Sequence, residues 1–335
     1  MKKLLVTGGH ATPALAVIEE LQKKEGWEIN WVGEEKAVTG TSVKTLEYTT
    51  LPSLGIPFYP LITLKLHRGK LVENILSLWK FPVGFAQSFL LLLRLRPDVV
   101  LSFGSYISFP ICFLSKLLGI PVVIHEQTAA SGLANRIVGL FADRVAISFQ
   151  DSSVYFPKEK TVLTGNPIRK VFFEIASERK RKKPVKHPYL IVFCGSRGSI
   201  AVNNAVLSAL PGILLKCNVM HITGALDHKR VIEERQKLPT PLRARYQVIE
   251  SLSIHEVPGA LGVADFALAR AGANTVTEFA AVGLPAIFVP LPHAGSNEQQ
   301  KNAETLSHKG AAIIIKQEKL TKDKLLKAID SVLKN

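Results

Sequence analysis

Cysteine and paired histidines are scarce in this sequence. Its 335 residues contain three cysteines, Cys112, Cys194 and Cys217, which are far apart and show no C-x-x-C spacing. We therefore expect neither a disulfide framework nor a zinc site, and the cytosol is the natural compartment. None of the nine histidines pairs with another at H-x-x-x-H spacing, so no metal site is predicted. A G-x-S-x-G motif is also missing, which argues against a serine nucleophile.

Acidic residues are outnumbered by basic ones, yet the signatures of nucleic-acid-binding proteins are missing. The formal net charge is +15 at pH 7. The chain has no zinc-finger, RNP or helix-turn-helix signature and no interleaving of aromatic with basic residues, so we predict no nucleic-acid partner. Basic surface also attracts phosphorylated small molecules and anionic lipid. These two classes remain as the expected partners.

Aromatic residues make up only 7% of the chain, whereas hydrophobic residues reach 47%. The apolar residues gather in short bursts that alternate with helix-length amphipathic stretches. Several bursts are nearly continuous Val/Ile/Leu runs, which is typical of parallel strands covered on both faces. This alternation predicts an α/β fold built from βαβ units. Strands are expected at 3–6, 29–32, 99–102, 122–125, 144–147, 190–193, 219–222, 266–269 and 286–289.

The strand, glycine turn and helix of the N-terminus occur again at residues 188–210. A charged stretch between the two halves, SERKRKKPVK at 177–186, is interpreted as a solvated linker. We therefore predict two Rossmann-like parallel-sheet domains, 1–165 and 166–335, that face each other across a cleft. Ligands of such sheets bind outside the carboxyl ends of the strands, so the site is expected in that cleft.

Long uninterrupted hydrophobic runs are missing too. Only a short apolar run precedes Thr7, so a buried strand is expected there and not a signal peptide. Residues 71–95 are unusually apolar, but polar residues and a proline interrupt them, so no spanning helix is expected. One interpretation is a buried helix. The other is a patch with Trp79, Phe81 and Phe85 that dips into an anionic membrane surface, with basic residues around it.

Glycine-rich turns stand where predicted strands meet predicted helices, at 8–10, 195–198 and 271–275. A fourth turn of small residues follows the strand at 99–102. Without a Cβ, glycine lets a phosphate oxygen approach the backbone, where the free N–H groups of a helix's first turn bind it. None of the turns is G-x-G-x-x-G or a Walker loop, and one alone would say little. Their presence in both halves favours a diphosphate ligand.

His10 is the one histidine on a glycine turn at the predicted cleft. A neutral imidazole can take a proton from an alcohol near pH 7. The positive end of the adjacent helix favours the neutral ring. His10 is therefore the candidate catalytic base, and the alternative is that it caps its own helix or holds the turn.

The stretch ARAGANTVTEFAAVGLPAIFVPLP, at 269–292, is the most informative. Glu278 lies one turn into the helix that starts near Thr275, where its carboxylate suits the paired hydroxyls of a ribose. The alternative is that Glu278 only complements the helix dipole. Farther on, Asn297 and Gln299 open another helix, and amides suit sugar hydroxyls because they both donate and accept hydrogen bonds. An ordinary polar helix start is the alternative there.

Five segments, in order, carry a resemblance: TGGHATPALAVIEEL, PDVVLSFGSYIS, GIPVVIHEQTAASGLANR, LTGNPIR and RAGANTVTEFAAVGLPAIFVPLPH. Together they resemble the MurG family of glycosyltransferases. The resemblance implies a GT-B type fold and an inverting enzyme. Such an enzyme transfers N-acetylglucosamine from UDP-N-acetylglucosamine to lipid I, a lipid-linked muramyl-peptide diphosphate, and so makes lipid II for peptidoglycan and cell-wall biogenesis.

The resemblance also implies where this happens and with what. The N-terminal domain would take the lipid-linked acceptor, and the C-terminal domain would bind UDP-N-acetylglucosamine. The protein would be peripheral, at the cytoplasmic face of the bacterial cell membrane, with an anionic membrane surface as a partner. No metal and no other cofactor is implied for the chemical step. Cell-wall synthesis proteins, which serve cell shape and division, are candidate partners.

Site residues are carried over position by position. His10 matches the family's histidine and would be the base. Ser196 would meet the donor diphosphate, Ile254 would lie over the uracil, and Glu278 would accept from the ribose hydroxyls. The region around 75–85 matches the family's membrane-facing patch. The positions with an implied substrate-binding role are Thr7, Gly8, Gly9, Asn135, Arg169, Ser196, Ile254, Ala273, Asn274, Thr275, Val276, Thr277, Glu278 and Gln299.

Three motifs depart from the family pattern. The family opens with G-G-T-G-G-H where this chain has T-G-G-H, so its first loop is a few residues shorter. HEQT replaces H-E-Q-N, and CGSRGS replaces G-G-S-Q-G-A. Two alternatives stay open: a related UDP-sugar transferase with another lipid acceptor, such as diacylglycerol, and a degenerate protein that binds UDP-sugar without turnover. A non-hydrolysing UDP-sugar 2-epimerase shares the architecture but not these motifs.

Overall fold

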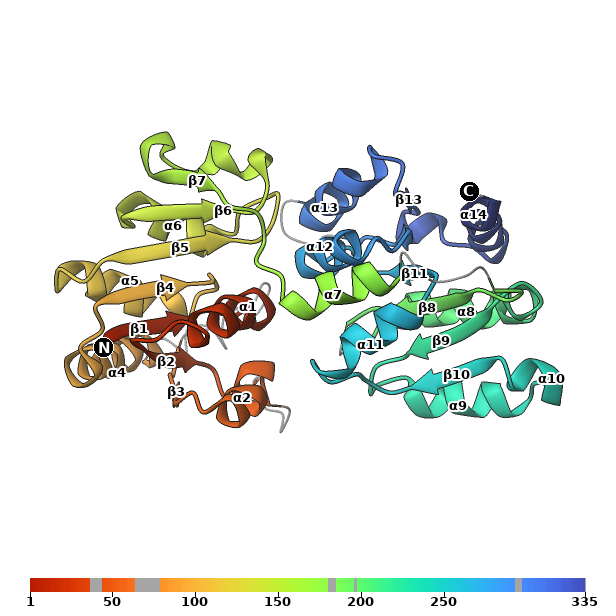
Figure 1. Cartoon of the computed structure of the whole chain (residues 1–335), viewed down its shortest axis with the longest axis horizontal. Coiled ribbons are helices and arrows are strands. Elements are labelled where there is room, and N and C mark those ends of the chain that lie inside the picture. The colour runs from red at the N-terminus through yellow and green to blue at the C-terminus, as the bar shows by residue number, and fades with distance from the viewer. Residues whose placement is uncertain (37–43, 64–78, 180–184, 196–197, 293–296, 335) are drawn as a thin grey trace. The chain divides into compact units, whose positions relative to one another are not determined.

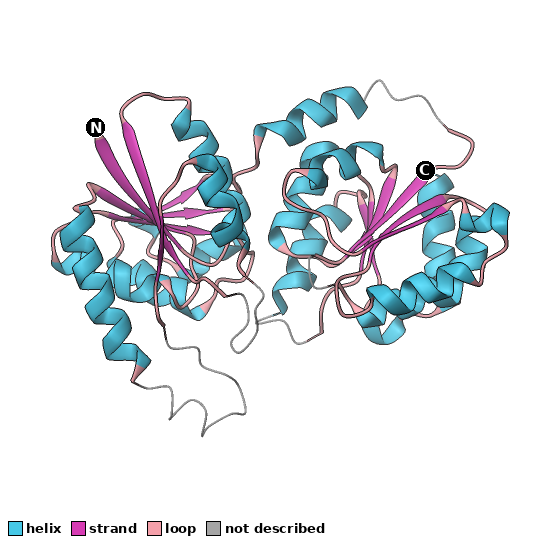
Figure 2. Ribbon diagram, turned by 90° about the horizontal axis from the view of Figure 1, so that it is seen from below, coloured by secondary structure: helices cyan, strands magenta, loops and turns pink. Residues whose placement is uncertain are grey.

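Two separate parallel β-sheets organise the chain (Figure 1). The computed structural model describes residues 1–36, 44–63, 79–179, 185–195, 198–292 and 297–334. The chain divides into two compact units, Met1–Arg169 and Lys170–Asn335. Each unit contains one sheet with helices on both of its faces (Figure 2). Both domains are therefore Rossmann-like, which confirms the predicted fold class.

The N-terminal unit is built on a seven-stranded sheet with the strand order β3-β2-β1-β4-β5-β6-β7. The strands are β1 (Lys2–Thr7), β2 (Trp27–Gly33), β3 (Phe58–Pro60), β4 (Val99–Ser102), β5 (Val122–Glu126), β6 (Arg144–Ile147) and β7 (Thr161–Leu163). The helices are α1 (Ala11–Gln22), α2 (Leu46–Thr50), α4 (Lys80–Leu95), α5 (Ser108–Leu117) and α6 (Leu133–Phe141), with short 3₁₀ turns at Leu51–Leu54, Gln150–Tyr155 and Lys158–Lys160.

The C-terminal unit has a six-stranded sheet in the order β10-β9-β8-β11-β12-β13. Its strands are β8 (Tyr189–Phe193), β9 (Asn218–Ile222), β10 (Tyr246–Ile249), β11 (Phe266–Ala269), β12 (Ala286–Phe288) and β13 (Ala312–Ile314). Its helices are α7 (Lys170–Arg179), α8 (Ile200–Leu214), α9 (His228–Gln236), α10 (Thr240–Arg243), α11 (Glu256–Val263), α12 (Ala273–Val282), α13 (Glu298–Ser307) and α14 (Lys322–Lys334), with a 3₁₀ turn at Gln317–Lys319.

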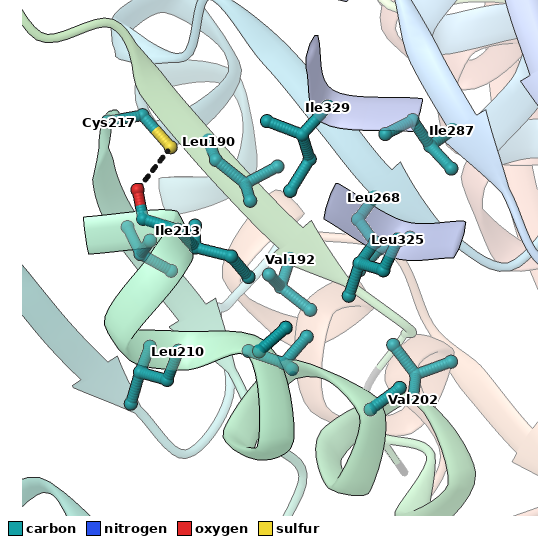
Figure 3. Close-up of a cluster of buried hydrophobic side chains, with 14 of the residues drawn as sticks. Leu190, Val192, Val202, Leu210, Ile213, Cys217, Leu268, Ile287, Leu325 and Ile329 are labelled. Atoms are coloured by element: carbon teal, nitrogen blue, oxygen red, sulfur yellow. Dashed lines mark hydrogen bonds between the residues drawn. The ribbon is translucent and has the colours of Figure 1, made fainter. Parts of the chain in front are cut away.

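The core of the C-terminal unit shows why its strands are continuous apolar runs. Leu190 and Val192 of β8 point toward Ile213 of α8 and Leu325 of α14, and all four side chains are buried (Figure 3). Removing a buried leucine or isoleucine side chain from such a core costs about 2–5 kcal/mol. These contacts hold α8 on the sheet. The first turn of α8 is therefore fixed at the carboxyl end of β8, where a ligand would bind.

All nine predicted strands are present, and every strand pair within the two sheets is parallel. The four strands that the pattern missed are β3, β7, β10 and β13, which are the outermost strands of the two sheets. An outermost strand is covered less completely and does not need a continuous apolar run. Pro60 in β3 fits this position, because proline cannot donate a ladder hydrogen bond and is tolerated at a sheet edge.

Helix α4 forms the described part of the apolar region at 71–95, whose residues 71–78 lie outside the described residues. One face of α4 confirms the interpretation as a buried helix. Gly84, Ser88, Leu92 and Leu95, spaced three or four residues apart, are buried against the unit. Phe81 is 48% exposed on another side of the same helix. In the described part of the chain, none of the helices has the length and apolar character that crossing a bilayer would require.

Candidate active site

The turn after β1 is locked against the turn after β4. The N–H of Phe103 donates to the Thr7 carbonyl at 2.8 Å, and the N–H of Gly9 donates to the Gly104 carbonyl at 3.2 Å. Gly8 has a φ of +132°, and a Cβ there would stand 2.8 Å from the Phe103 carbonyl carbon. Only glycine fits this position without strain. The predicted turn residues Thr7, Gly8 and Gly9 thus lie at the carboxyl end of β1, against the turn that follows the neighbouring strand β4.

His10 follows this turn, and its ring is fixed by one hydrogen bond. Nδ1 lies 3.0 Å from the carbonyl oxygen of Phe103. A carbonyl oxygen can only accept, so Nδ1 carries the proton, and in the neutral ring Nε2 keeps a free lone pair. The His10 side chain makes no capping bond to α1. Of the two alternatives to catalysis, side-chain capping of the helix is therefore wrong. A role in holding the turn agrees with the bond to Phe103, and this bond leaves Nε2 available as a base.

A buried carboxylate holds Asn135 against the same pair of turns. Glu126, at the end of β5, is only 3% exposed and accepts from the Thr128 hydroxyl (2.7 Å), the Ser131 hydroxyl (2.8 Å) and the Asn135 amide (3.0 Å). A Cβ on Gly104 would stand 2.8 Å from Asn135 Nδ2, so Asn135 packs directly on that turn. His10 and Asn135, both predicted site residues, therefore contact neighbouring residues of one turn.

Several buried polar atoms at this sheet edge have no protein partner among the described residues. The Oγ1 of Thr7, the Oε1 of Gln127 and the Oδ1 of Asn135 are buried and have no hydrogen-bond partner among the described residues. Leaving a buried acceptor unpaired costs about 1–3 kcal/mol. Such atoms in a native fold call for an explanation, such as a bound water, an ion or a ligand. Ligand donors that reach Thr7 or Asn135 would relieve this cost.

His125 lies at the same sheet edge, but unlike His10 it has a hydrogen-bond partner at each ring nitrogen. Its Nε2 lies 3.1 Å from the Gly165 carbonyl, and its Nδ1 lies 3.0 Å from the Gln127 amide nitrogen, so both ring nitrogens are occupied. Burial lowers the pKa of His125 below its usual value. The ring is thus neutral and fully engaged. Sequence reasoning did not assign His125 or Glu126, although an HEQ triplet at the end of a predicted strand could have indicated them.

Arg169, which the resemblance places on the substrate, forms an ion pair inside the N-terminal unit. Its Nε donates to Glu19 Oε1 at 2.6 Å, and the arginine side chain is largely buried. Glu19 belongs to α1, whose first residue follows His10. Arg169 therefore holds α1 against the last residues of this unit.

The glycine turn after β8 is the counterpart in the C-terminal unit. Gly198 has a φ of +67°, and a Cβ there would stand 1.9 Å from the Thr223 carbonyl oxygen, a distance no side chain can tolerate. Ser199 then caps α8, with its hydroxyl oxygen accepting from the N–H of Val202 at 3.4 Å. The predicted Ser196 lies outside the described residues.

Arg270 ties three loops of the C-terminal unit together. Its guanidinium donates to the Ser199 hydroxyl at 2.7 Å, to the Val289 carbonyl at 3.0 Å and to Gln317 Oε1 at 2.6 Å. Burial lowers the pKa of Arg270 from its usual high value, and an arginine stays charged even so. Arg270 stands in the RAGANTVTE motif, but its role depends on partners far away in the chain and was not predicted.

The predicted UDP residues 273–278 form the first turns of α12, which begins after Gly272. No acidic residue lies in the first turn, so the free N–H groups there suit an anion. Glu278 is the sixth residue of the helix and only 8% exposed. It therefore lies beyond the positions where a carboxylate stabilises a helix dipole most.

The remaining predicted residues lie on loops and a helix of the same unit. Gln299, in the first turn of α13, accepts the N–H of Leu291 through its Oε1 at 3.0 Å and so fixes the loop after β12. The amide nitrogen of Asn302 donates to the Ala271 carbonyl at 3.2 Å and holds the start of α12. Ile254 is half-buried between β10 and α11. Among the described residues, no group of three or more metal-ligating side chains is suitably placed.

Two family profiles match this chain. The profile of the N-terminal domain of glycosyltransferase family 28 matches residues 7–147, and that of its C-terminal domain matches residues 189–335. A protein of Halalkalibacterium halodurans named UDP-N-acetylglucosamine–N-acetylmuramyl-(pentapeptide) pyrophosphoryl-undecaprenol N-acetylglucosamine transferase is 37% identical over 336 residues, which cover 98% of this chain and 88% of that protein.

Solved structures agree with the fold. The crystal structure of Acinetobacter baumannii MurG has a TM-score of 0.72 and 28% identity, and covers 100% of this chain and 91% of that one. The UDP-GlcNAc 2-epimerase of Methanocaldococcus jannaschii has a TM-score of 0.66 at 14% identity, covering 100% of this chain and 93% of that one. At such low identity, the epimerase shares the fold alone.

Proposed function

The chain belongs to glycosyltransferase family 28, and on this premise we propose that it transfers N-acetylglucosamine from UDP-N-acetylglucosamine to N-acetylmuramyl-(pentapeptide) pyrophosphoryl-undecaprenol. The product is lipid II, the lipid-linked disaccharide of peptidoglycan. Near-full-length similarity to a transferase of this name supports the proposal and favours this acceptor over diacylglycerol. The 2-epimerase likeness is a likeness of fold.

His10 supplies the base in this proposal. Nε2 removes the proton from the acceptor hydroxyl as the oxygen attacks the anomeric carbon, and the bonding pair of the breaking C–O bond leaves with the diphosphate of UDP. The ring becomes an imidazolium, whose Nδ1–H still donates to the Phe103 carbonyl. One base and one displacement invert the anomeric centre. The main support for this role is the hydrogen bond from Nδ1 to the Phe103 carbonyl, because it leaves Nε2 as the basic nitrogen.

The two units serve the two substrates. The N-terminal unit takes the acceptor, with the unpaired Thr7 oxygen as a contact. We assign the unpaired oxygen of Asn135, which matches the family's donor-binding asparagine, to the donor. The C-terminal unit takes UDP-N-acetylglucosamine. There we assign the N-termini of α12 and α8 to the diphosphate, where their backbone N–H groups stabilise the leaving group in place of a cation. We assign Glu278 to the ribose, Ile254 to the uracil, Ser196 to the diphosphate and Gln299 to the sugar.

The acceptor's lipid requires the protein to reach a membrane. Trp79, which is 57% exposed, and Phe81 stand next to Lys80, while Arg94 and Arg96 lie exposed at the other end of α4. Aromatic side chains beside cationic ones suit an anionic bilayer surface, to which each cation adds about 1 kcal/mol. We therefore place the protein as a peripheral protein on the cytoplasmic face of the cell membrane.

A turnover assay with and without the base tests the proposal. The chain is incubated with UDP-N-acetylglucosamine and the lipid-linked muramyl-peptide acceptor without added metal, and the disaccharide product is measured. His10→Ala should lower kcat about 10²–10⁴-fold, as expected for loss of a general base. His308→Ala removes an exposed histidine and should not change the rate. If the wild-type protein forms no product, the proposed transferase activity is wrong. If His10→Ala is as active as wild type, the assignment of His10 as the general base is wrong.

A further inference from the structure

A cavity opens between α4, α5 and α6 on one face of the N-terminal unit. Its volume is about 360 Å³. Its apolar walls come from the three helices: Phe81 and Gly84 from α4, Phe109 and Pro110 from α5, and Leu133 and Ile137 from α6. Most of its lining is carbon, and the charged side chain that contributes to it is Lys80.

One end of this pocket is polar and reaches the carboxyl edge of the sheet. Tyr106 and Thr63 line it there. The Tyr106 hydroxyl donates to Glu34 Oε2 at 2.5 Å, and the Thr63 hydroxyl donates to Glu34 Oε1 at 3.3 Å. Glu34 follows the last residue of β2, and Tyr106 lies in the turn after β4.

The polar end is directly connected to the turn that positions His10. Ser105 precedes Tyr106, and a Cβ on Gly9 would stand 2.9 Å from the Ser105 Cβ. The turn that contributes Tyr106 to the pocket therefore packs against the residue that precedes His10. A ligand whose polar part lies at these turns could place an attached apolar chain in the pocket.

We propose that this pocket holds the first isoprene units of the acceptor's polyprenyl chain. The inference rests on the proposed function, in which the acceptor is a pyrophosphoryl-undecaprenol. An apolar cavity of roughly 150 Å³ accepts a benzene ring, so this pocket has room for about two or three five-carbon units. Lys80 supplies a positive charge for the diphosphate, and the chain beyond the pocket continues over exposed apolar side chains of α4 toward the bilayer.

Two tryptophan variants on one helix test the pocket. Ile137 lines it and is 41% exposed, whereas Leu140, 68% exposed on the same helix, does not line it. Ile137→Trp should raise the KM for the undecaprenyl acceptor about 10-fold and leave the KM for UDP-N-acetylglucosamine unchanged. Leu140→Trp adds similar bulk outside the pocket and should leave both KM values unchanged. With an acceptor that carries a methyl group in place of the chain, Ile137→Trp should equal wild type.

A chain-length series keeps the inference testable if Ile137→Trp does not fold. With wild-type protein in detergent micelles, KM should fall as acceptors gain their first two or three isoprene units and then level off. A KM that is independent of chain length, or equal effects of the two tryptophan variants on KM, would overturn the proposal that the pocket binds the polyprenyl chain. The proposal would also be wrong if Ile137→Trp no longer bound anionic vesicles but kept the wild-type KM for the acceptor. A phospholipid chain would then be the occupant of the pocket. Turnover of no acceptor at all would instead refute the proposed function.

Discussion

The two glycine turns of this protein, one in each unit, share a construction and differ in chemistry. In both, a glycine packs against the backbone of a neighbouring strand's turn: Gly8 against Phe103, and Gly198 against Thr223. The N-terminal turn then presents a titratable ring, His10, with Nε2 available. The C-terminal turn is followed by Ser199, whose hydroxyl is held by the half-buried Arg270. In the proposed function, one βα geometry thus serves proton transfer in one unit and anion binding in the other, through the residues that follow the glycine.

The largest expected effect comes from breaking the C-terminal turn. Gly198→Ala would place a methyl group 1.9 Å from the Thr223 carbonyl, so the backbone must move. We expect a loss of about 3 kcal/mol in the free energy of unfolding of this unit and weaker UDP binding. Urea denaturation followed by circular dichroism and UDP titration by calorimetry measure the two effects.

Gly195→Ala is the matched control for this prediction. Its φ of +76° is also left-handed, but a Cβ there would meet nothing within 4 Å. It should therefore cost only about 1–2 kcal/mol, which is the backbone strain. Equal losses in the two variants would mean that the contact with Thr223 does not matter.

A smaller effect is expected from Arg270→Lys, which has no counterpart in the N-terminal turn. Lysine keeps the charge but cannot donate in the planar fork that reaches Ser199, Val289 and Gln317 at once. We expect a loss of about 2 kcal/mol in unfolding free energy and a higher KM for UDP-N-acetylglucosamine. Arg144→Lys, at an exposed arginine that donates to the Asp143 carbonyl, should stay within about 0.5 kcal/mol of wild type. A stable Arg270→Lys with normal KM would exclude this role of the guanidinium.

The sequence predicted what is local and missed what depends on distant partners. The central strands were predictable because each is a run of apolar residues buried on both faces. The edge strands β3 and β13, three residues each, are half-covered and give a weaker pattern. The glycine turns and His10 were found because their motif is contiguous. The tautomer of His10 was not predictable, since it depends on a carbonyl 93 residues away in the chain.

The buried parts of the site illustrate the same limit. Glu126 acts through hydrogen bonds to Thr128, Ser131 and Asn135, and Arg270 through bonds to residues up to 71 positions away. No spacing rule connects such partners before the fold is known. The substrate contact that its motif implies for Arg169 stays a prediction, whereas its ion pair with Glu19, 150 positions away in the chain, could not be predicted.

The smallest predicted effect concerns pH, where the two units should respond differently. Burial lowers the pKa of His221, in the C-terminal unit, to about 3. Its contribution to stability is present above pH 6.5 and is lost as pH falls toward 3. Burial and the nearby Glu34 raise the pKa of Glu47, in the N-terminal unit, to about 7. Its contribution is present below pH 4.5 and is lost as pH rises through 7.

Between pH 4.5 and 6.5 these two groups therefore change stability in opposite directions. The C-terminal unit should gain about 1 kcal/mol per pH unit. In the N-terminal unit, burial lowers the pKa of His125, which acts in the same direction as His221, and Glu47 opposes it. All three tryptophans, Trp27, Trp31 and Trp79, belong to the N-terminal unit. Their fluorescence in urea therefore follows this unit. Circular dichroism reports both units, so a transition that it shows and the fluorescence does not belongs to the C-terminal unit.

Glu47→Gln should remove the opposing contribution, so that the N-terminal unit also gains stability with pH. His221→Gln should flatten the response of the C-terminal unit whatever it does to stability at a single pH, because the slope depends only on bound protons. If Glu47→Gln leaves the slope of the tryptophan transition unchanged, the buried carboxyl does not titrate with folding. The two units would then respond to acid alike, and the contrast between them would be confined to their turns.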